Sequence, residues 1–385
     1  MPVIRQLLMD HPEGNTNPPS RLSFVGDYLP DVDFDRVGPW SSDALVANLE
    51  AVILEPGAAV RPKAYSVAVG PEAFERVRRS KVSAFNLANN HVYDAGSVSF
   101  DQMVRRLAGI SGAQFYGLRD RPHAVISVGD TTCAVIGCLE RCRARGPALF
   151  PEEEVESLVA RLRGQYDRVY VTPHWSKEGE LALHPGPHQR TLARRWVEAG
   201  ADGVFGHHSH TIHGRETIEG SPIYYSLGNY QFDHAEGRSY PAAAWGMVVR
   251  VDPRHAGSPE QVEFFIQEGG TVIPVDAAAS RLMHEHLEHL SSDLSSASRS
   301  EWSWARAVGP VFIAKCRKSW NRRLRASPAR SIALWAAWNL MPRTMLFRLG
   351  CLVPDRRVSE YRELIDRRMV EERRRLLSVD HSGRQ

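Results

Sequence analysis

The chain has 385 residues, of which 43% are hydrophobic and 24% are charged, and this composition excludes a largely disordered protein. The net charge is only +3, but residues 299–375 hold 19 Lys and Arg against 7 Asp and Glu. An acidic body followed by a basic C-terminal region is therefore predicted, and nucleic acid is not expected among the partners.

The cysteines and the N-terminus favour a cytoplasmic protein. The five cysteines are scattered and form no CxxC pair, which is typical of reduced thiols. We expect residues 1–20 to be a flexible segment, and they lack the apolar region of roughly 7–15 residues that a secretory signal needs. No uninterrupted apolar run reaches the ~20 residues of a membrane-spanning helix.

Residues 21–275 are expected to form one α/β catalytic domain, because short apolar runs alternate there with helical patterns. The predicted strands end in polar turns and are RLSFVGD, VSAFNLANN, RVYVTPH, DGVFGHH and PIYYSLGN. The predicted helices cover residues 71–80, 97–107, 152–163 and 188–199, and residues 123–139 predict a hairpin around Gly129-Asp130. Such alternation implies layered architecture, with ligands bound at the carboxyl ends of strands.

Residues 276–385 are predicted to form a basic helical extension. Four prolines interrupt its helices, and Arg343 and Arg348 interrupt its most apolar part, residues 331–353. Two interpretations stay open for this part. Its tryptophans pack against the α/β body, or they enter a membrane surface while flanking arginines meet anionic lipid at the inner face.

Two carboxylates follow early strands. Asp27 ends the strand LSFV, where it can bind a cation or cap a turn. Glu50 ends the sequence Asn48-Leu49-Glu50, directly after an apolar segment that resembles a strand. It is either a metal ligand or a surface charge. Each of these signals is weak when taken alone.

The segment NLANNHVYDAG, residues 86–96, is more specific. Two amides and an imidazole, from Asn89, Asn90 and His91, crowd into one turn after a strand, and such groups are costly to bury unless each is hydrogen-bonded. An amide oxygen can bind a metal, and the adjacent histidine can act as a general acid. Asn89 and Asp94 are alternatively structural residues that bond the backbone of the turn.

Histidines follow two later strands. His174 ends RVYV, and GVFGHHSH places His207, His208 and His210 directly after a buried strand. In extended backbone, His208 and His210 would point to the same side and could share a metal centre. Neutral imidazole is a common ligand for zinc, iron and manganese.

Other patterns are weaker. LMHEHLEHL, with His284, His286 and His289, lacks the HExxH pattern and predicts a solvated helix face. The chain has no GxSxG, GxxxxGK[ST] or GxGxxG motif, so a serine hydrolase and an ATP- or NAD-dependent enzyme have no support.

Taken in order, these motifs resemble the CapA family of poly-γ-glutamate capsule synthesis proteins over residues 21–250. That family is similar in fold to the calcineurin-like metallophosphoesterases, so the resemblance implies a four-layer β-sandwich flanked by helices. The metal ligands that it implies are Asp27, Glu50, Asn90, His174, His208 and His210. It also implies catalytic roles for Asp27 and His91. The residues expected to orient these groups or line the pocket are Asn89, Asp94, His207, Ser226 and Asn229.

The resemblance implies a metal-dependent hydrolase that cleaves a phosphoester or related bond with two divalent ions, Mn, Fe, Zn or Co, and a metal-activated water. The expected substrate is an anionic small molecule or polymer. Leu29 stands where classical metallophosphoesterases carry a histidine. Two consequences stay open: one metal position is weaker, or Glu50 supplies the missing ligand. Two alternatives stay open: an accessory protein in the assembly or export of an anionic polymer, and a biosynthetic tailoring enzyme that uses the same site.

Overall fold

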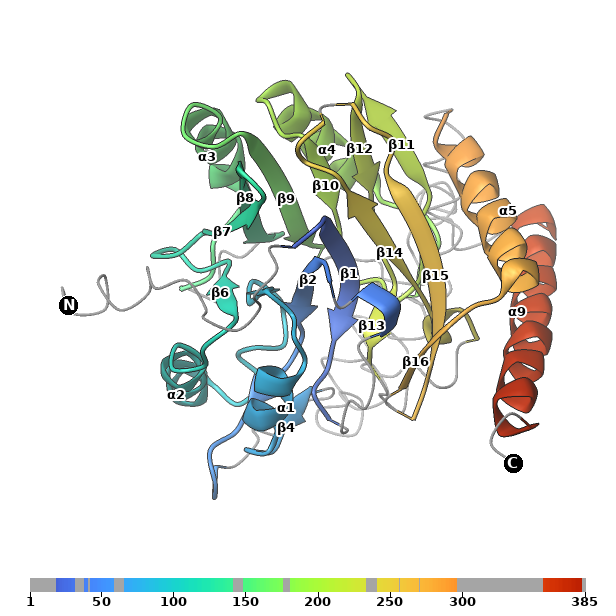
Figure 1. Ribbon diagram of the computed structural model, residues 1–385, viewed down its shortest axis with the longest axis horizontal. Coiled ribbons are helices and arrows are strands. Elements are labelled where there is room, and N and C mark those ends of the chain that lie inside the picture. Colours follow the sequence, from blue (N-terminus) through green and yellow to red (C-terminus); the bar gives the residue numbers. More distant parts are fainter. Residues whose placement is uncertain are drawn as a thin grey trace, which may run out of the picture.

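The computed structural model describes residues 19–31, 38–40, 42–58, 66–140, 148–175, 181–232, 241–255, 257–269, 271–295 and 356–382. Within these residues the protein has a mixed α/β fold, as predicted, built around two β-sheets (Figure 1). The short elements outside the two sheets are β3 (Val52–Ile53), β4 (Ala68–Val69) and the 3-10 helices η2 (Gly38–Trp40), η4 (Glu152–Glu154) and η6 (Pro241–Ala244).

The first sheet has the strand order β16-β15-β14-β1-β2-β5-β6, with β13 paired to β1. Its strands are β1 (Leu22–Tyr28), β2 (Ala44–Leu49), β5 (Ala84–Asn86), β6 (Gln114–Tyr116), β13 (Asn229–Gln231), β14 (Trp245–Val251), β15 (Gln261–Glu268) and β16 (Thr271–Pro274). β1, β2 and β5 are parallel, and Asp27 lies in register with Asn48 and Asn229. The carboxyl ends of these strands therefore share one edge.

The second sheet has the order β11-β12-β10-β9-β8-β7. Its strands are β7 (His123–Val128), β8 (Thr131–Leu139), β9 (Arg168–His174), β10 (Gly203–Phe205), β11 (Arg215–Ile218) and β12 (Ser221–Tyr224). β7 and β8 form the predicted hairpin, with Val128 opposite Thr131. β8, β9, β10 and β12 are parallel, so the second sheet also collects its strand ends at one edge.

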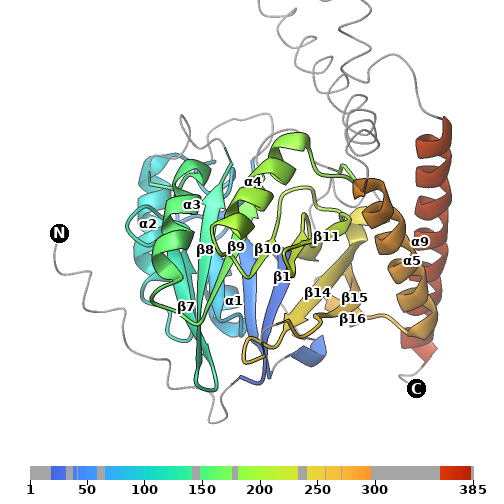
Figure 2. The same cartoon turned by 90° about the horizontal axis from the view of Figure 1, so that it is seen from above.

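The two sheets pack face to face, and helices cover their outer faces (Figure 2). Between the sheets, Phe24 of the first stacks on Phe205 of the second, with ring centroids 3.8 Å apart. α1 (Ala73–Arg79) and α2 (Ser97–Leu107) cover the first sheet, and α3 (Val155–Leu162) and α4 (Pro187–Glu198) cover the second. The order of layers is helix, sheet, sheet, helix, and burial of the apolar face of each element stabilises it.

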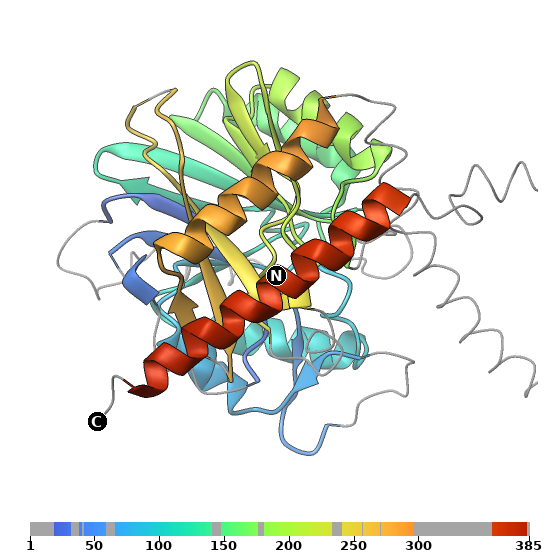
Figure 3. The same cartoon turned by 90° about the vertical axis from the view of Figure 1, so that its right-hand side faces the viewer.

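Two helices follow the sheets, α5 (Ala277–Leu294) and α9 (Arg356–Ser382), and they lie side by side (Figure 3). α5 begins where the Asp276 side chain accepts hydrogen bonds from the N–H groups of Ala278 and Ala279. The same carboxylate forms an ion pair with Arg375 of α9, with Nη1 and Oδ2 2.6 Å apart. Both helices add apolar side chains to the core between the sheets.

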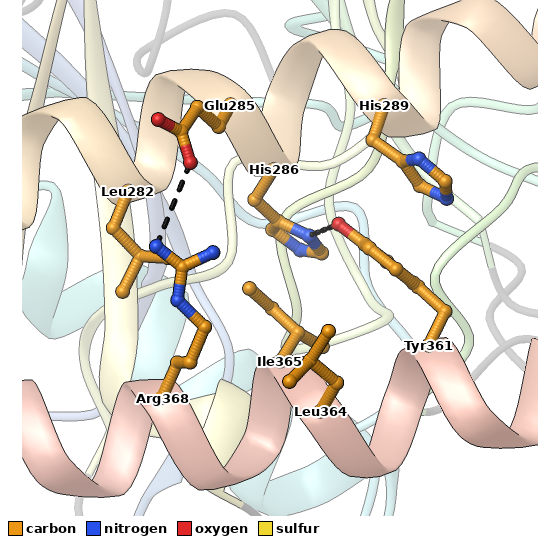
Figure 4. Close-up of a pocket in the computed structure, with 8 residues that line it drawn as sticks. All are labelled: Leu282, Glu285, His286, His289, Tyr361, Leu364, Ile365 and Arg368. Carbon is orange, nitrogen blue, oxygen red and sulfur yellow. Dashed lines mark hydrogen bonds and ion pairs between the residues drawn. The ribbon is translucent and has the colours of Figure 1, made fainter.

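The prediction of a solvated histidine face on α5 was wrong for His286. Its side chain is only 1% exposed, and Nδ1 lies 2.8 Å from the hydroxyl oxygen of Tyr361 on α9 (Figure 4). Its neighbour His289 stacks on the same tyrosine, with ring centroids 3.7 Å apart. The sequence of α5 could not indicate this burial, because the covering helix lies much later in the chain.

Several predictions fall wholly or largely outside the described residues. These are the flexible segment 1–20, the region 296–355 with both interpretations of its tryptophans, and Cys142, Cys316 and Cys351. Cys133 and Cys138 are buried, reduced thiols. In the part of the chain that the structure describes, no helix has the length and apolar character needed to span a membrane.

Candidate metal centre

Polar side chains from both sheets meet where the strands end. Asp27 lies near the end of β1, Glu50 directly follows β2, and His174 is the last residue of β9. His207 follows β10 and pairs with His174 through an isolated parallel β-bridge, which joins the two strand ends. Because carboxyl ends of parallel strands share an edge, segments far apart in the sequence deliver their donors to one place.

A first group of donors surrounds the Nε2 atom of His174. That atom lies 2.6 Å from Oδ1 of Asn90, 3.2 Å from Nδ1 of His208 and 3.5 Å from Oε1 of Glu50. Glu50 and His174 are both completely buried. These groups could hold one metal ion.

A second group contains Asp27, Glu50 and His210, and it could also hold a metal ion. Nδ1 of His210 lies 3.3 Å from Oδ2 of Asp27, and Nε2 lies 3.9 Å from Oε1 of Glu50. Glu50 therefore belongs to both groups. A carboxylate that belongs to both groups could contact two metal ions at once.

The electrostatics of the donors suit a divalent cation. Burial, and secondly the neighbouring His208, lower the pKa of His174 well below its usual value, so its ring stays neutral and keeps a lone pair. Burial acts to raise the pKa of Asp27, but the neighbouring rings of His207 and His210 lower it well below its usual value. The ionised carboxylate of Asp27 and the neutral ring of His174 are the kinds of donor that bind a divalent cation, and mixed N and O ligands suit Mn²⁺, Fe²⁺, Zn²⁺ or Co²⁺.

The backbone around the histidine motif differs from the extended conformation that we expected. His208 and His210 have φ angles of 104° and 57°, in the left-handed region that favours glycine. Each such residue costs about 1–3 kcal/mol, which the surrounding contacts must offset. One of these contacts is the hydrogen bond of 3.2 Å from the backbone N–H of His208 to Oδ2 of Asp27. The two side chains consequently face different groups of donors and share only Glu50.

His91 also lies near Glu50, but its ring is held in place by Asp94. Its Nδ1 lies 2.7 Å from Oδ2 of Asp94, which also accepts a hydrogen bond of 2.8 Å from the backbone N–H of Val67. Its Nε2 lies 3.9 Å from Oε1 of Glu50. With Nδ1–H donating to Asp94, the other ring nitrogen faces the centre.

Asn89 makes the contacts that its structural interpretation predicted. Its Oδ1 accepts hydrogen bonds from the backbone N–H groups of His91 and Val92, at 3.1 and 3.2 Å. Its Nδ2 donates to the carbonyl of Leu49, at 2.7 Å. Asn89 thereby ties the turn that carries Asn90 and His91 to the strand end that carries Glu50.

The other predicted pocket residues hold neighbouring groups in place. Nδ1 of His207 lies 3.5 Å from Oδ1 of Asp27. Oγ of Ser226 accepts a hydrogen bond of 3.3 Å from the N–H of Gly228, within its own loop. Asn229 places Oδ1 2.9 Å from Nδ1 of His210 and donates from Nδ2 to the carbonyl of Ala243.

Asn48 is a residue to which we assigned no role from the sequence. Its Nδ2 donates to Oδ1 of Asp27 at 2.8 Å and lies 3.2 Å from Nδ1 of His174. Its Oδ1 lies 3.4 Å from Nδ2 of Asn89. Asn48 precedes Glu50 by two positions, and strand periodicity alone would place both side chains on one face.

A further group of possible metal donors lies just beyond the carboxyl end of β8 in the second sheet. The sequence did not indicate this group. Nε2 of His188 lies 3.1 Å from Oε1 of Glu152 and 3.8 Å from Oε1 of Glu140. The backbone N–H of Glu140 donates to the carbonyl of His174. This group is therefore a neighbour of the centre and shares no donor with it.

Comparisons with solved structures return distant likenesses. A novel phosphatase from Mycoplasma pneumoniae is 11% identical, with a TM-score of 0.43, covering 66% of this chain and 95% of that one. A 5'-nucleotidase precursor from Thermus thermophilus is 14% identical, with a TM-score of 0.42, covering 71% of this chain and 60% of that one. Likenesses at this level assign no function.

Sequence relatives are closer. The capsule biosynthesis protein CapA of Bacillus anthracis is 26% identical over 280 residues, covering 67% of this chain and 66% of that protein. The PGA biosynthesis protein CapA of Bacillus subtilis is 27% identical, covering 57% and 65%. A probable polyglutamine synthesis accessory protein of Mycobacterium tuberculosis is also 27% identical, covering 50% and 57%. The chain spans about two thirds of the length of the two Bacillus proteins.

The model of the family described as "Bacterial capsule synthesis protein PGA_cap" matches residues 34–234. The match includes every predicted site residue except Asp27, which precedes it. It also covers more than half of the chain. The chain therefore belongs to the PGA_cap family of bacterial capsule synthesis proteins, and the CapA proteins of Bacillus are its relatives.

Proposed function

We propose that this chain is a metal-dependent hydrolase of the metallophosphoesterase type, with two metal positions, that cleaves a phosphoester or a related bond in an anionic substrate. One observation carries the proposal. Glu50 is shared by two groups of donors, and its Oε1 lies within 4 Å of the Nε2 atoms of His174, His91 and His210. A ligand common to both groups would hold two ions close together, as two-metal hydrolysis uses them, and His91 lies beside that ligand without belonging to either group.

The residues divide between the two positions. Asn90, His174 and His208 would hold one ion, Asp27 and His210 would hold the other, and Glu50 would contact both. Divalent ions held there would supply Lewis-acid activation of water and of the bond under attack. Asn48 orients Asp27 through a hydrogen bond of 2.8 Å, so it supports the position that Asp27 would help to form.

His91 is the candidate general acid. Its Nδ1–H donates to Asp94, which fixes the tautomer and the orientation of the ring. Its Nε2 faces the shared carboxylate, in position to give a proton to a leaving oxygen. Asp94 is itself held by the backbone N–H of Val67, so it acts as a positioning residue for His91.

The experiment that tests the proposal combines metal analysis with an activity screen. The full chain is purified without chelator, its metal content is measured, and hydrolysis of a chromogenic phosphodiester is followed. We expect about two ions per chain and hydrolysis that a chelator abolishes. His284→Ala provides the matched control, because this histidine packs its ring edge-on against Phe264 and belongs to neither group of donors. Absence of bound metal, or hydrolysis unaffected by the chelator, would contradict the proposal.

A second candidate function is supported by the relatives, which are called capsule or PGA biosynthesis proteins and a polyglutamine synthesis accessory protein. In this alternative the same donors and metal bind the carboxylates of an anionic polymer without cleaving it. Metal-dependent binding of poly-γ-glutamate, with the polymer length unchanged and no phosphodiester hydrolysis, would favour the accessory role.

A further inference from the structure

The carbonyl oxygen of Ala243, in η6, is the junction of a small hydrogen-bond network. It accepts from Nδ2 of Asn229 at 3.0 Å and from Nε2 of Gln267 at 2.9 Å. A carbonyl has two lone pairs, so both bonds form together. Asn229 is completely buried and Gln267 is 8% exposed, so water competes little with these contacts.

This network fixes the protonation of His210. The Ala243 carbonyl only accepts, so the amide nitrogen of Asn229 must point towards it, and Oδ1 must then point towards Nδ1 of His210. Oδ1 of Asn229, 2.9 Å away, and the carboxylate of Asp27, with Oδ2 3.3 Å away, both only accept, so Nδ1 carries the proton and Asn229 is its nearer acceptor. The lone pair is left on Nε2, the atom that lies 3.9 Å from Oε1 of Glu50. A neutral histidine in this tautomer is ready to bind a metal through Nε2.

Gln267 supports His210 by a second route. Its Oε1 accepts a hydrogen bond of 2.6 Å from the backbone N–H of Phe232. The ring of Phe232 packs against the ring of His210, with centroids 4.6 Å apart. The side chain of Gln267 therefore makes two contacts that affect His210. It donates to the Ala243 carbonyl, which orients Asn229, and it accepts from the backbone of Phe232, whose ring packs on His210.

The C-terminal helix backs this arrangement from the other side. Ala242 and Ala244 of η6 share an apolar cluster with Ile365 and Met369 of α9. α9 is attached along α5 by the contact between Tyr361 and His286 and by an ion pair between Arg368 and Glu285 (Figure 4). Packing of α9 thus holds η6 against the strand that carries Gln267.

We propose that Gln267 is a positioning residue for His210, acting together with Asn229 through the Ala243 carbonyl, with α9 keeping that carbonyl in place. The role of His210 as a ligand rests on the proposed metal centre. The effect of Gln267 on the His210 tautomer is independent of the proposed metal centre, because the tautomer is measured in the metal-free protein.

The test uses long-range ¹H–¹⁵N correlation spectra of the metal-free full chain labelled with ¹⁵N-histidine, with the His210 signals assigned from His210→Gln. We expect wild-type His210 to be mainly Nδ1-protonated, and Gln267→Met to give a mixture of tautomers. Gln267→Glu keeps the acceptor for Phe232 but loses the donor to Ala243, so it should give an intermediate result, and it serves if Gln267→Met does not fold.

Gln114 provides the matched control, because its side-chain amide also makes two hydrogen bonds to backbone, both to Val125. Gln114→Met should leave the His210 signals unchanged. Wild-type-like His210 signals in both Gln267 variants would overturn the proposal, whether or not the protein binds metal.

A Co²⁺ titration of the same variants gives the second measurement. We expect Gln267→Met to raise the Kd of one Co²⁺ equivalent by about tenfold and to leave the other unchanged, because outer partners of a metal-binding histidine typically contribute 10–100-fold. Equal weakening of both equivalents would contradict a specific action on His210. If wild type binds no Co²⁺, the proposed function fails, and the tautomer measurement still decides the role of Gln267.

Discussion

Two histidine-rich segments of this chain have opposite surroundings. GHHSH carries three histidines at a strand end, and LMHEHLEHL carries three on helix α5. At the strand end, His208 and His210 lie in groups of donors that contain buried carboxylates. On α5, His286 and His289 contact Tyr361, and within the described residues no group of metal donors includes an α5 histidine.

The comparison shows that the number of histidines does not determine a metal site. A site needs carboxylates that remain ionised and imidazoles that remain neutral, brought to one point by rigid elements. The strand end brings candidate donors together because parallel strands from two sheets deliver Asp27, Glu50 and His174 to the same edge. On α5 the neighbouring elements offer aromatic rings, so the histidines there pack and hydrogen-bond.

Substitution of Glu50 should have the largest effect. Glu50→Ala removes the only donor that both groups share, so we expect loss of metal from both positions. Hydrolysis should fall by more than about a hundredfold, because outer partners alone contribute 10–100-fold. Metal content by mass spectrometry checks this, with Glu285→Ala on α5 as the control. Retention of both ions in Glu50→Ala would refute the shared ligand.

The two histidine-rich segments can be compared directly. His208→Ala and His210→Ala should each lose one of two ions, because they contribute to different groups of donors. His284→Ala and His289→Ala should retain both. Loss of metal in an α5 variant, or normal content in both strand-end variants, would reverse the assignment.

His91 should affect turnover without affecting metal content. His91→Ala should retain its metal and lose about 10²–10⁴-fold in turnover, the usual range for a positioned acid–base group. Steady-state kinetics of protein with verified metal content would measure this. Loss of metal together with activity would instead make His91 a ligand.

The α5 histidines should affect stability and not metal binding. Burial, and then the nearby His289 and His184, lower the pKa of His286 to about 3, against an ordinary value near 6.5. As the pH decreases, His286 is therefore protonated in the unfolded chain before it is protonated in the folded protein. The free energy of unfolding should consequently fall between about pH 6.5 and pH 3. One such proton contributes a slope of up to about 1.4 kcal/mol per pH unit.

His286→Leu should reduce that slope, measured by denaturation at several pH values. Tyr361 faces His286 from α9, so Tyr361→Phe is the matched control: it removes the hydrogen bond and leaves the titrating ring in place. A slope unchanged in His286→Leu would show that other groups, such as His213, dominate the acid sensitivity.

Much of the centre could be predicted from the sequence because its donors follow apolar strands, and strand ends converge in layered α/β proteins. The hairpin at Gly129-Asp130 was predictable for a similarly local reason, the Gly-Asp turn between two apolar runs. The left-handed backbone of His208 and His210, the links made by Asn48, and the burial of His286 were not. Each depends on contacts between segments distant in the sequence. Strand periodicity places Asn48 on the same face as Glu50, but it does not indicate which distant side chains Asn48 contacts.

The most direct measurement is a crystal structure of the full chain grown with Mn²⁺, analysed by anomalous scattering. We expect two anomalous peaks about 3.5–4 Å apart, one beside His174 and His208 and one beside His210, with Glu50 contacting both. A single peak, or peaks only at α5 or at the Glu140–Glu152–His188 group, would contradict a two-metal centre at the strand ends.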